Sequence, residues 1–514
     1  MPGERSSSRH RRASWLLLEL GEGLGRTLRQ QLREALKEAV RSGRLPTGTV
    51  LPPTRSLAAD LNISRGVVVE VYTQLCEEGF LAARPGSGTV VTQAGSQSPF
   101  PRPHTVDARD GEPPPTLAYA IDLRPGPPDL ASFPRAYWLA AMREVLRALP
   151  DAELGYVPPW GVAALREELS TYLSRVRGAM VPPDELLIVS GVTQGLALLA
   201  RVLVRIGYAS LAVESPSNAA QRLILGSYGL RIVDVPVDSE GLDVAALTDS
   251  GCRAVLVTPA HQYPCGVALS PARRSALMHW AENIDGLVIE DDYDSEFRYD
   301  RKPIGCLQGL APHRVALVGS VSKSLAPGLR LGWLAAPARF QPLVMAAKRD
   351  DDFGTPVLGQ HTLARLIADG RYDRHVRRVR RRYMERRDGL VRALGRELPS
   401  WEVSGSAAGL HVLAWLPPEL DEERLLAGAA AAGVVTQGTR PMYGSLPPRD
   451  GVVIGYARAP VSVLTDAVHR LAGAVALTRS GGPPDAPPSE IRPATALDYF
   501  REPSNLTSSL KFAD

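Results

Sequence analysis

The sequence predicts an α/β protein in which a small winged helical domain precedes a large domain built on a mostly parallel sheet with helices on both faces. Three observations predict it. Residues 20–92 alternate helical periodicity with helix caps and close on two short strand patterns. Residues 121–478 alternate helical patterns with short apolar runs, which is typical of βαβ units. Between them, residues 93–120 are rich in proline, glycine and serine and predict a linker.

The composition is that of a globular protein, and the chain is longer than one hydrophobic core usually organises. Of the 514 residues, 44% are hydrophobic and 22% are charged, close to average usage. No apolar run is long enough to cross a bilayer, so we expect no membrane partner. The four cysteines lie far apart without a CxxC pair, which predicts neither a disulfide framework nor a zinc site. We therefore expect no metal and a reducing, cytoplasmic location.

The net charge gathers near the N-terminus. Residues 1–92 hold 13 lysines and arginines against 9 aspartates and glutamates, which equals the +4 of the whole chain. A local basic excess suits a surface that neutralises phosphates. Before Glu19 the apolar stretch Trp15–Leu18 is too short for an export signal. We expect residues 1–19 to be a disordered basic lead and residues 479–514 to be a disordered tail.

Three helices and a β-wing are expected in the N-terminal domain. Residues 24–41 carry leucines and alanines at helical spacing and are followed by Gly43. Thr54 is expected to cap a short second helix, and Ser64 a third helix that ends at Gly79. The run LAARPGSGTVVT predicts two strands around a Pro-Gly-Ser-Gly turn.

The stretch LPPTRSLAADLNISRGVVVEVYTQLCEEGFLAARPGSGTVV resembles the winged helix-turn-helix of GntR-type regulators, over about residues 20–92. The resemblance implies that double-stranded DNA is contacted at two helix starts and in the wing, by Arg55, Ser64, Arg65 and Gly86. Gly66 stands where the family commonly has a hydroxyl or amide side chain, so one phosphate contact is expected to be missing. The alternative is that the two arginines are surface charges at helix N-termini.

Apolar runs predict the strands of the large sheet at 187–190, 211–213, 254–258, 287–290 and 315–319. Open α/β sheets hold their ligands at the carboxyl ends of such strands. Lys323 follows the last run by four residues, and its amine can form an imine with an aldehyde. Near it in the sequence, Ser320 and Ser322 supply two hydroxyls and Arg330 supplies a guanidinium. These three groups can bind a phosphate dianion.

Two other strand ends carry groups that complete such a ligand site. Asp291 and Tyr293 follow the run 287–290, where a carboxylate can keep a pyridine nitrogen protonated and a phenol can hydrogen-bond a ring oxygen. Backbone amides at a helix N-terminus form a second phosphate cradle, from Ser190, Gly191 and Val192. Taken singly, each also has an interpretation without a ligand. Asp291 can belong to an acidic surface cluster, Tyr293 can be a packing residue, and residues 190–192 can simply start a helix.

The middle of the chain is similar to fold type I (aspartate aminotransferase-like) proteins that bind pyridoxal 5′-phosphate (PLP). Segments such as GYVPPWGVAALREELSTYL, TPAHQYPCGVALSPARR and the lysine run GSVSKSLAPGLRLG carry the similarity. Together with the winged helix, the chain resembles the MocR subfamily of GntR regulators over about residues 15–475. The resemblance implies PLP as cofactor, bound to Lys323 as a Schiff base and held by Asp291, Tyr293 and the phosphate groups above. It also implies a head-to-tail homodimer in which each winged helix packs on the other protomer.

Three positions bear on the effector. Asn218 occupies the place where relatives usually put an aromatic ring that stacks on the cofactor, and Tyr263 stands where many aminotransferases have an asparagine. Arg440 lies where related regulators place an arginine for an amino-acid carboxylate. It is either that effector-binding residue or a surface charge. In the second case PLP itself could be the sensed ligand.

One further segment, residues 371–387, is strongly basic and carries Val376, Val379 and Tyr383 on a helical stripe. The simpler interpretation is a solvated helix whose arginines pair with acidic neighbours. A secondary DNA track is the alternative.

Two functions remain open on the sequence. The first is a PLP-dependent transcription regulator of PLP synthesis or of amino-acid or amine metabolism, which senses PLP or its aldimine with an amine or amino acid. The second is an active PLP-dependent aminotransferase that carries a DNA-binding domain. The winged helix and the missing stacking ring favour the regulator, with a residual transaminase half-reaction left open.

Overall fold

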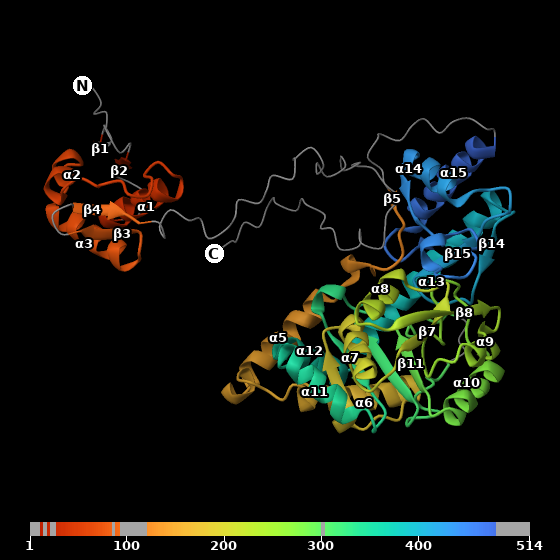
Figure 1. Cartoon of the computed structure of the whole chain (residues 1–514). Coiled ribbons are helices and arrows are strands. Elements are labelled where there is room, and N and C mark those ends of the chain that lie inside the picture. The colour runs from red at the N-terminus through yellow and green to blue at the C-terminus, as the bar shows by residue number, and fades with distance from the viewer. Residues whose placement is uncertain are drawn as a thin grey trace. The chain divides into compact units, whose positions relative to one another are not determined.

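The computed structural model describes residues 11–13, 18–20, 27–84, 88–92, 121–299 and 304–479. The chain forms two compact units, residues 1–113 and 114–514 (Figure 1). The boundary between them falls inside the predicted linker. Residues 93–120, and the predicted tail beyond Arg479, lie outside the described residues.

The predicted lead contains paired backbone where we expect disorder. Strand β1 (Arg11–Ala13) pairs antiparallel with β2 (Leu18–Leu20). The ladder hydrogen bonds of this short hairpin account for the difference, because they satisfy backbone groups that a disordered segment leaves to water.

Unit 1 has the predicted three helices and wing, which are α1 (Leu28–Arg41), α2 (Thr54–Asp60), α3 (Arg65–Glu77), β3 (Leu81–Arg84) and β4 (Gly88–Val91). Ser64 caps α3 as predicted, since its side chain accepts a hydrogen bond from the Val67 amide. Two boundaries differ. Helix α1 begins after Thr27, which forms a capping box with Gln30. Thr54 is the first residue of α2 and does not cap it, because Pro53 occupies the N-cap position.

Unit 2 is built on an eight-stranded sheet. Its strands are β6 (Leu186–Val189), β7 (Ser210–Ser215), β8 (Arg231–Asp238), β9 (Gly241–Leu242), β10 (Ala254–Val257), β11 (Leu287–Asp292), β12 (Val315–Ser320) and β13 (Gly332–Ala335). Their order is β6-β13-β12-β11-β10-β7-β8-β9. Only β13 and β9 run antiparallel to their neighbours. The carboxyl ends of β6, β7, β10, β11 and β12 therefore meet at one edge.

Helices cover both faces of this sheet, as predicted. They are α5 (Arg135–Ala148), α6 (Ala163–Arg177), α7 (Val192–Arg205), α8 (Ala219–Ser227), α9 (Val244–Asp249), α10 (Pro271–Asn283), α11 (Gln341–Asp352) and α12 (Val357–Ala368). Along β6, Leu187 and Val189 pack with α7, whereas Leu186 and Ile188 pack with α6 and α12. Burial on both faces explains why the strands read as continuous apolar runs.

A C-terminal lobe completes unit 2, seen in teal and blue in Figure 1. It holds the sheet β14-β15-β18-β17, formed by Glu402–Ser404, His411–Trp415, Gly451–Gly455 and Gln437–Gly438. The helices α13 (Arg371–Glu397), α14 (Glu422–Ala431) and α15 (Val461–Arg479) pack on it, and β16 (Val434–Val435) pairs with β5 (Ile121–Asp122).

Helix α15 corrects one expectation from the sequence. It is the one described helix long and apolar enough, by length and composition, to cross a membrane. Its residues Leu464, Val468 and Leu471 are fully buried in the core of the C-terminal lobe. A core helix of this kind meets the same criterion, so the finding does not by itself indicate a membrane span.

The two units have separate cores, which predicts separate responses to a core mutation. Leu36 is 1% exposed in the core of unit 1, and Leu36→Ala should cost about 2–5 kcal/mol of the stability of that unit. In scanning calorimetry the transition of unit 1 should fall by at least about 8 °C, while that of unit 2 should stay in place. Leu464→Ala is the reciprocal control, and joint movement of both transitions in either variant would contradict separate cores.

Candidate functional site

A cavity of about 300 Å³ opens at the edge where the carboxyl ends of the parallel strands meet. Residues between 125 and 330 supply most of its lining, and the C-terminal lobe adds Leu410, His411, Gln437 and Met442. Of the nine residues predicted to hold a cofactor, the structure brings seven to this cavity: Val192, Asp291, Tyr293, Ser320, Ser322, Lys323 and Arg330.

Lys323 presents its amine at the cavity wall in the turn after β12. Its Nζ donates a hydrogen bond to the Gly126 carbonyl at 2.7 Å. Burial lowers the pKa of the amine, while the charges of Asp294 and Asp291 oppose that shift. A lowered pKa enlarges the neutral fraction of the amine, which is the nucleophilic form.

Asp291 on β11 is a buried carboxyl with one free oxygen. Its Oδ2 accepts a hydrogen bond from Gln221 Nε2 at 2.6 Å, while its buried Oδ1 has no hydrogen-bond partner among the described residues. Burial raises the pKa of this carboxyl to about 7, against the hydrogen bond from Gln221. An unpartnered buried acceptor costs free energy unless a ligand satisfies it. The geometry therefore suits a ligand with an N–H group, such as a protonated pyridine.

Tyr293 brings a neutral phenol to the same cavity. Its Oη lies 2.9 Å from His261 Nδ1, and the same ring nitrogen lies 2.9 Å from Asp294 Oδ2. Burial, with the negative charge of Asp294, holds the pKa of the phenol well above its usual value. The hydroxyl therefore stays protonated and able to hydrogen-bond a ligand oxygen.

The phosphate end of the predicted site differs in one part from the prediction. Ser320, Ser322 and Arg330 line the cavity, whereas Ser190 and Gly191 do not. The Ser190 amide donates to Gln194 Oε1 at 2.7 Å, and the Ser190 carbonyl accepts from the Arg330 guanidinium. The Ser190 carbonyl thus holds Arg330, and neither Ser190 nor Gly191 lines the cavity.

Gly191 lies beside Arg330 in a backbone conformation that favours glycine. Its φ is +90°, and a Cβ atom there would lie 3.2 Å from Arg330 Nη2. Arg330 is itself in the left-handed region, with φ +49°, which is uncommon for a residue with a side chain and often marks functional positions.

Several lining residues escaped the sequence analysis. Gln221 bonds Asp291 from one turn into α8, Thr258 lines the cavity after β10, and Glu214 is a fully buried carboxyl whose pKa burial raises to about 7. His411 is buried, which lowers its pKa to about 3 and keeps it neutral. A rule on the carboxyl ends of strands could have found Glu214 and Thr258, whereas nothing in the local sequence identifies His411.

The two departures noted in the sequence both lie at the cavity. Asn218 lines it and also caps α8, where its side chain accepts from the Ala220 amide. Tyr263 lines it and makes edge-on contacts with Tyr293 and His411. Asn218 offers no ring, so it cannot stack on a planar ligand.

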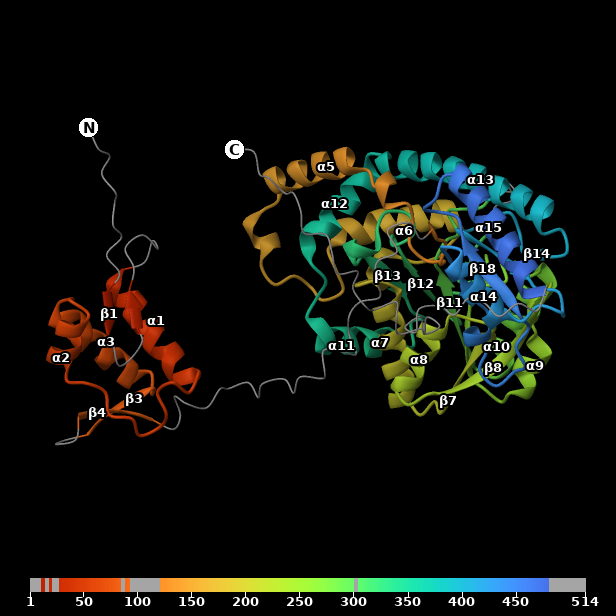
Figure 2. The ribbon, with the colours of Figure 1, turned by 90° about the horizontal axis from the view of Figure 1, so that it is seen from above.

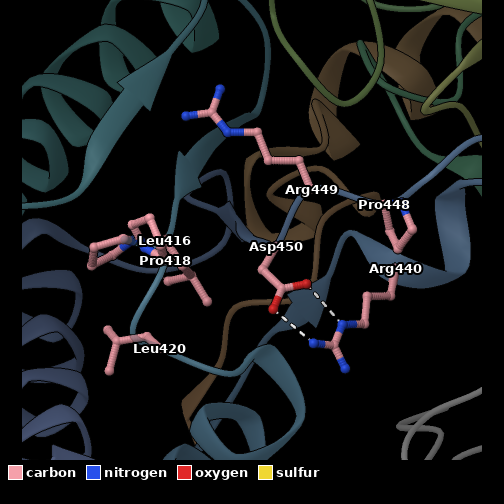
Figure 3. Close-up of a pocket in the computed structure, with 8 residues that line it drawn as sticks. Leu416, Pro418, Leu420, Arg440, Pro448, Arg449 and Asp450 are labelled. Atoms are coloured by element: carbon pink, nitrogen blue, oxygen red, sulfur yellow. Dashed lines mark hydrogen bonds and ion pairs between the residues drawn. The ribbon is translucent and has the colours of Figure 1, made fainter.

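Arg440 does not reach the cavity. It lines a second hollow, of about 630 Å³, with Leu416, Leu420 and Asp450 among its other walls (Figure 3). Its Nε and Nη2 donate to the two oxygens of Asp450 at 2.7 Å, and Nη2 also donates to Asp421 at 2.8 Å. Two carboxylates therefore already occupy the guanidinium predicted to bind an effector carboxylate.

The predicted DNA contacts in unit 1 are exposed where they are described. Arg55 and Arg65 lie on the surface at the starts of α2 and α3, and neither forms an ion pair within residues 27–84 and 88–92 or elsewhere in the described chain. Ser64 is exposed as well, and its hydroxyl caps α3. Gly86 lies outside the described residues. The space around Gly66 is open enough for a serine side chain.

Comparison with known proteins agrees with both units. The family model of bacterial regulatory proteins of the gntR family matches residues 28–91, and that of aminotransferase class I and II matches residues 127–445. The pyridoxine biosynthesis transcriptional regulator PdxR of Corynebacterium glutamicum is 35% identical over 85% of this chain and 94% of its own. The probable rhizopine catabolism regulatory protein MocR of Rhizobium meliloti is 31% identical over 87% and 93%.

A solved structure extends the likeness of unit 2. An archaeal alanine:glyoxylate aminotransferase superposes with a TM-score of 0.65 at 29% identity, covering 69% of this chain and 90% of that one. The fold is thus the fold type I aminotransferase fold, preceded by a GntR winged helix-turn-helix. With relatives that share both parts over most of their length, the chain belongs to the MocR subfamily of GntR transcription regulators.

Proposed function

We propose that this chain is a DNA-binding transcription regulator that senses PLP, alone or joined to an amine, and that controls PLP synthesis or amino-acid or amine metabolism. It would act in the cytoplasm as a head-to-tail homodimer. The observation that carries the proposal is the presence, in a chain with a GntR winged helix, of Lys323 and the unpartnered Oδ1 of Asp291 in one cavity.

The residues around the cavity fit PLP. When bound, PLP would supply an aldehyde for the Lys323 amine and an electron-withdrawing ring. Asp291 would hold the ring nitrogen and Tyr293 the ring oxygen. Ser320, Ser322 and Arg330 would hold the phosphate, and the carbonyl of Ser190 keeps the Arg330 guanidinium in place.

The charges of the lining favour PLP itself as the ligand that is sensed. Lys323 and Arg330 are the two lysine or arginine side chains in the described lining, and bound PLP would engage both. No further guanidinium of the described chain lines the cavity for the carboxylate of an amino acid, because Arg440 is bound to Asp450 and Asp421.

An aminotransferase that carries a DNA-binding domain is the second candidate, and the likeness to solved aminotransferases favours it. Asn218 argues against it, because a cofactor without a stacked ring is held less firmly through repeated turnovers. Sustained turnover with an amino acid and a 2-oxo acid would support the enzyme, and a single half-reaction at most would support the regulator.

PLP should change the binding of this protein to the DNA upstream of its own coding region. In a gel-shift titration, added PLP should alter the affinity or the footprint of the wild-type protein, whereas Lys323→Ala should bind DNA without responding to PLP. The amine of Lys323 is the group that holds the aldehyde, so PLP without its aldehyde, as pyridoxamine phosphate, is the matched ligand control. Equal binding under all conditions would contradict sensing of PLP.

Asp291→Asn should change both stability and PLP binding. Burial raises the pKa of Asp291 from its ordinary value of 3.8 to about 7. The folded state therefore holds the proton more tightly, and this contribution to stability is present at low pH and is lost as pH rises through about 7. Between about pH 5 and about pH 8, the melting temperature of ligand-free wild-type unit 2 should fall relative to that of Asp291→Asn.

Added PLP should reverse this difference at the higher pH, since a protonated ring nitrogen pairs with the charged carboxylate and not with the amide. The PLP-induced rise in melting temperature should be smaller in Asp291→Asn than in the wild type. A difference between the two proteins that does not vary with pH would show that the Asp291 carboxyl is solvated.

A further inference from the structure

The basic segment 371–387 at the start of α13 contains nine arginines and two acidic residues. The simpler interpretation from the sequence was that these arginines pair with acidic neighbours. Four of them do so, namely Arg371 with Glu144, Arg382 and Arg386 with Asp129, and Arg387 with Asp388. The interpretation therefore accounts for fewer than half of the arginines.

Four other arginines of this segment have no carboxylate partner in the described chain. Arg374, Arg377, Arg378 and Arg381 are exposed, and none of them forms an ion pair within residues 121–299 and 304–479 or elsewhere in the described chain. The guanidinium of Arg378 lies 3.5 Å from Nδ1 of the His375 ring, and the four form no other side-chain hydrogen bond with described residues. Like charges held together on a surface repel one another, so this arrangement costs stability when nothing anionic binds it.

The four arginines lie on one face of α13. They occupy positions i, i+3, i+4 and i+7, which are neighbours on a helix surface. The opposite face carries the buried side chains of Val376, Val379 and Tyr383. We name Arg374, Arg377, Arg378 and Arg381 the arginine stripe, and it is about 10 Å long at the helical rise. Glu385, one turn further on the same face, ends it.

The stripe lies on an open side of unit 2. Figure 2 shows α13 along the outer edge of that unit, with α12 and α15 packed beneath it. Beyond residue 92 the chain carries equal numbers of basic and acidic residues, 46 of each. The stripe is therefore a local concentration of positive charge and not part of a generally basic surface.

We propose that the arginine stripe binds backbone phosphates of DNA, as a second contact besides the winged helix. A DNA strand carries one phosphate per about 3.4 Å of rise along the duplex axis, so a stripe of about 10 Å is long enough to lie against more than one backbone phosphate. A guanidinium binds a phosphate through two parallel hydrogen bonds. The gntR-family domain brings DNA to this protein, which makes DNA the polyanion that the stripe meets.

The salt dependence of DNA binding tests the proposal. The triple variant Arg377→Ala, Arg378→Ala and Arg381→Ala should stay folded, because alanine favours an exposed helix. With a long duplex from the region upstream of the coding sequence, the slope of log Kd against log salt should be smaller in magnitude by about 2 to 3 than in the wild type. Fluorescence anisotropy of the full-length protein at several salt concentrations gives this slope.

A matched control removes the same charge from other places on unit 2. Arg205→Ala, Arg231→Ala and Arg424→Ala replace exposed arginines of α7, β8 and α14 that form no ion pair in the described chain. This control should keep the wild-type slope. Equal slopes in the two triple variants would overturn the proposal and leave the stripe as a solvated surface.

Two further measurements separate this proposal from other outcomes. The oligomeric state of both variants should equal that of the wild type by light scattering, and a change confined to the stripe variant would overturn the proposal in favour of an interface between copies. The stripe variant should keep the PLP response of the wild type, because its side chains do not line the cavity. If the wild type lacks that response, the proposed sensing fails while the slopes still decide the stripe.

Discussion

The buried carboxyl of Asp291 and the half-buried Lys323 share one cavity, and neither has the other as a hydrogen-bond partner. Burial shifts both groups toward their neutral forms, since it raises the pKa of the acid and lowers that of the amine. The parallel strands bring the two groups to one edge, and the packed helices on both faces keep that edge rigid. The site therefore suits a ligand that donates a hydrogen bond to Asp291 and also bonds the amine of Lys323.

The neighbours of Asp291 show why this residue in particular faces the ligand. Glu290 accepts hydrogen bonds from the backbone amides of Leu307 and Gln308. Asp292 forms a buried ion pair with Arg177, and Asp294 bonds His261. Of these four acidic residues, Glu290, Asp292 and Asp294 bond other parts of the fold, and Asp291 lines the cavity. Alternation along β11 separates Asp291 from Glu290 and Asp292, because neighbouring residues of a strand point to opposite faces.

Much of this arrangement is predictable from the sequence. The apolar runs, helix caps and glycine stops indicate the strands and helices, and the rule that ligands lie at carboxyl ends brings Lys323, Asp291 and Tyr293 together. The roles predicted for Ser190 and Arg440 were wrong, since their surroundings depend on residues far along the chain. The Ser190 carbonyl accepts a hydrogen bond from Arg330, whose backbone lies in the left-handed region. Asp421 and Asp450 bind the Arg440 guanidinium outside the cavity, and their positions depend on how the C-terminal lobe folds.

Helix α13 contacts the turn that carries Lys323 on one side and bears the arginine stripe on the other. On its buried side, His375 Nε2 donates to the Ser324 carbonyl at 2.7 Å and the Tyr372 hydroxyl lies 2.7 Å from the Ser324 hydroxyl. Ser324 directly follows Lys323, so these contacts hold the turn that presents the amine. The arginine stripe lies on the outer side of the same helical turns. The turn and the stripe thus lie on opposite sides of one helix, and the free energy by which DNA alters PLP binding must equal that by which PLP alters DNA binding.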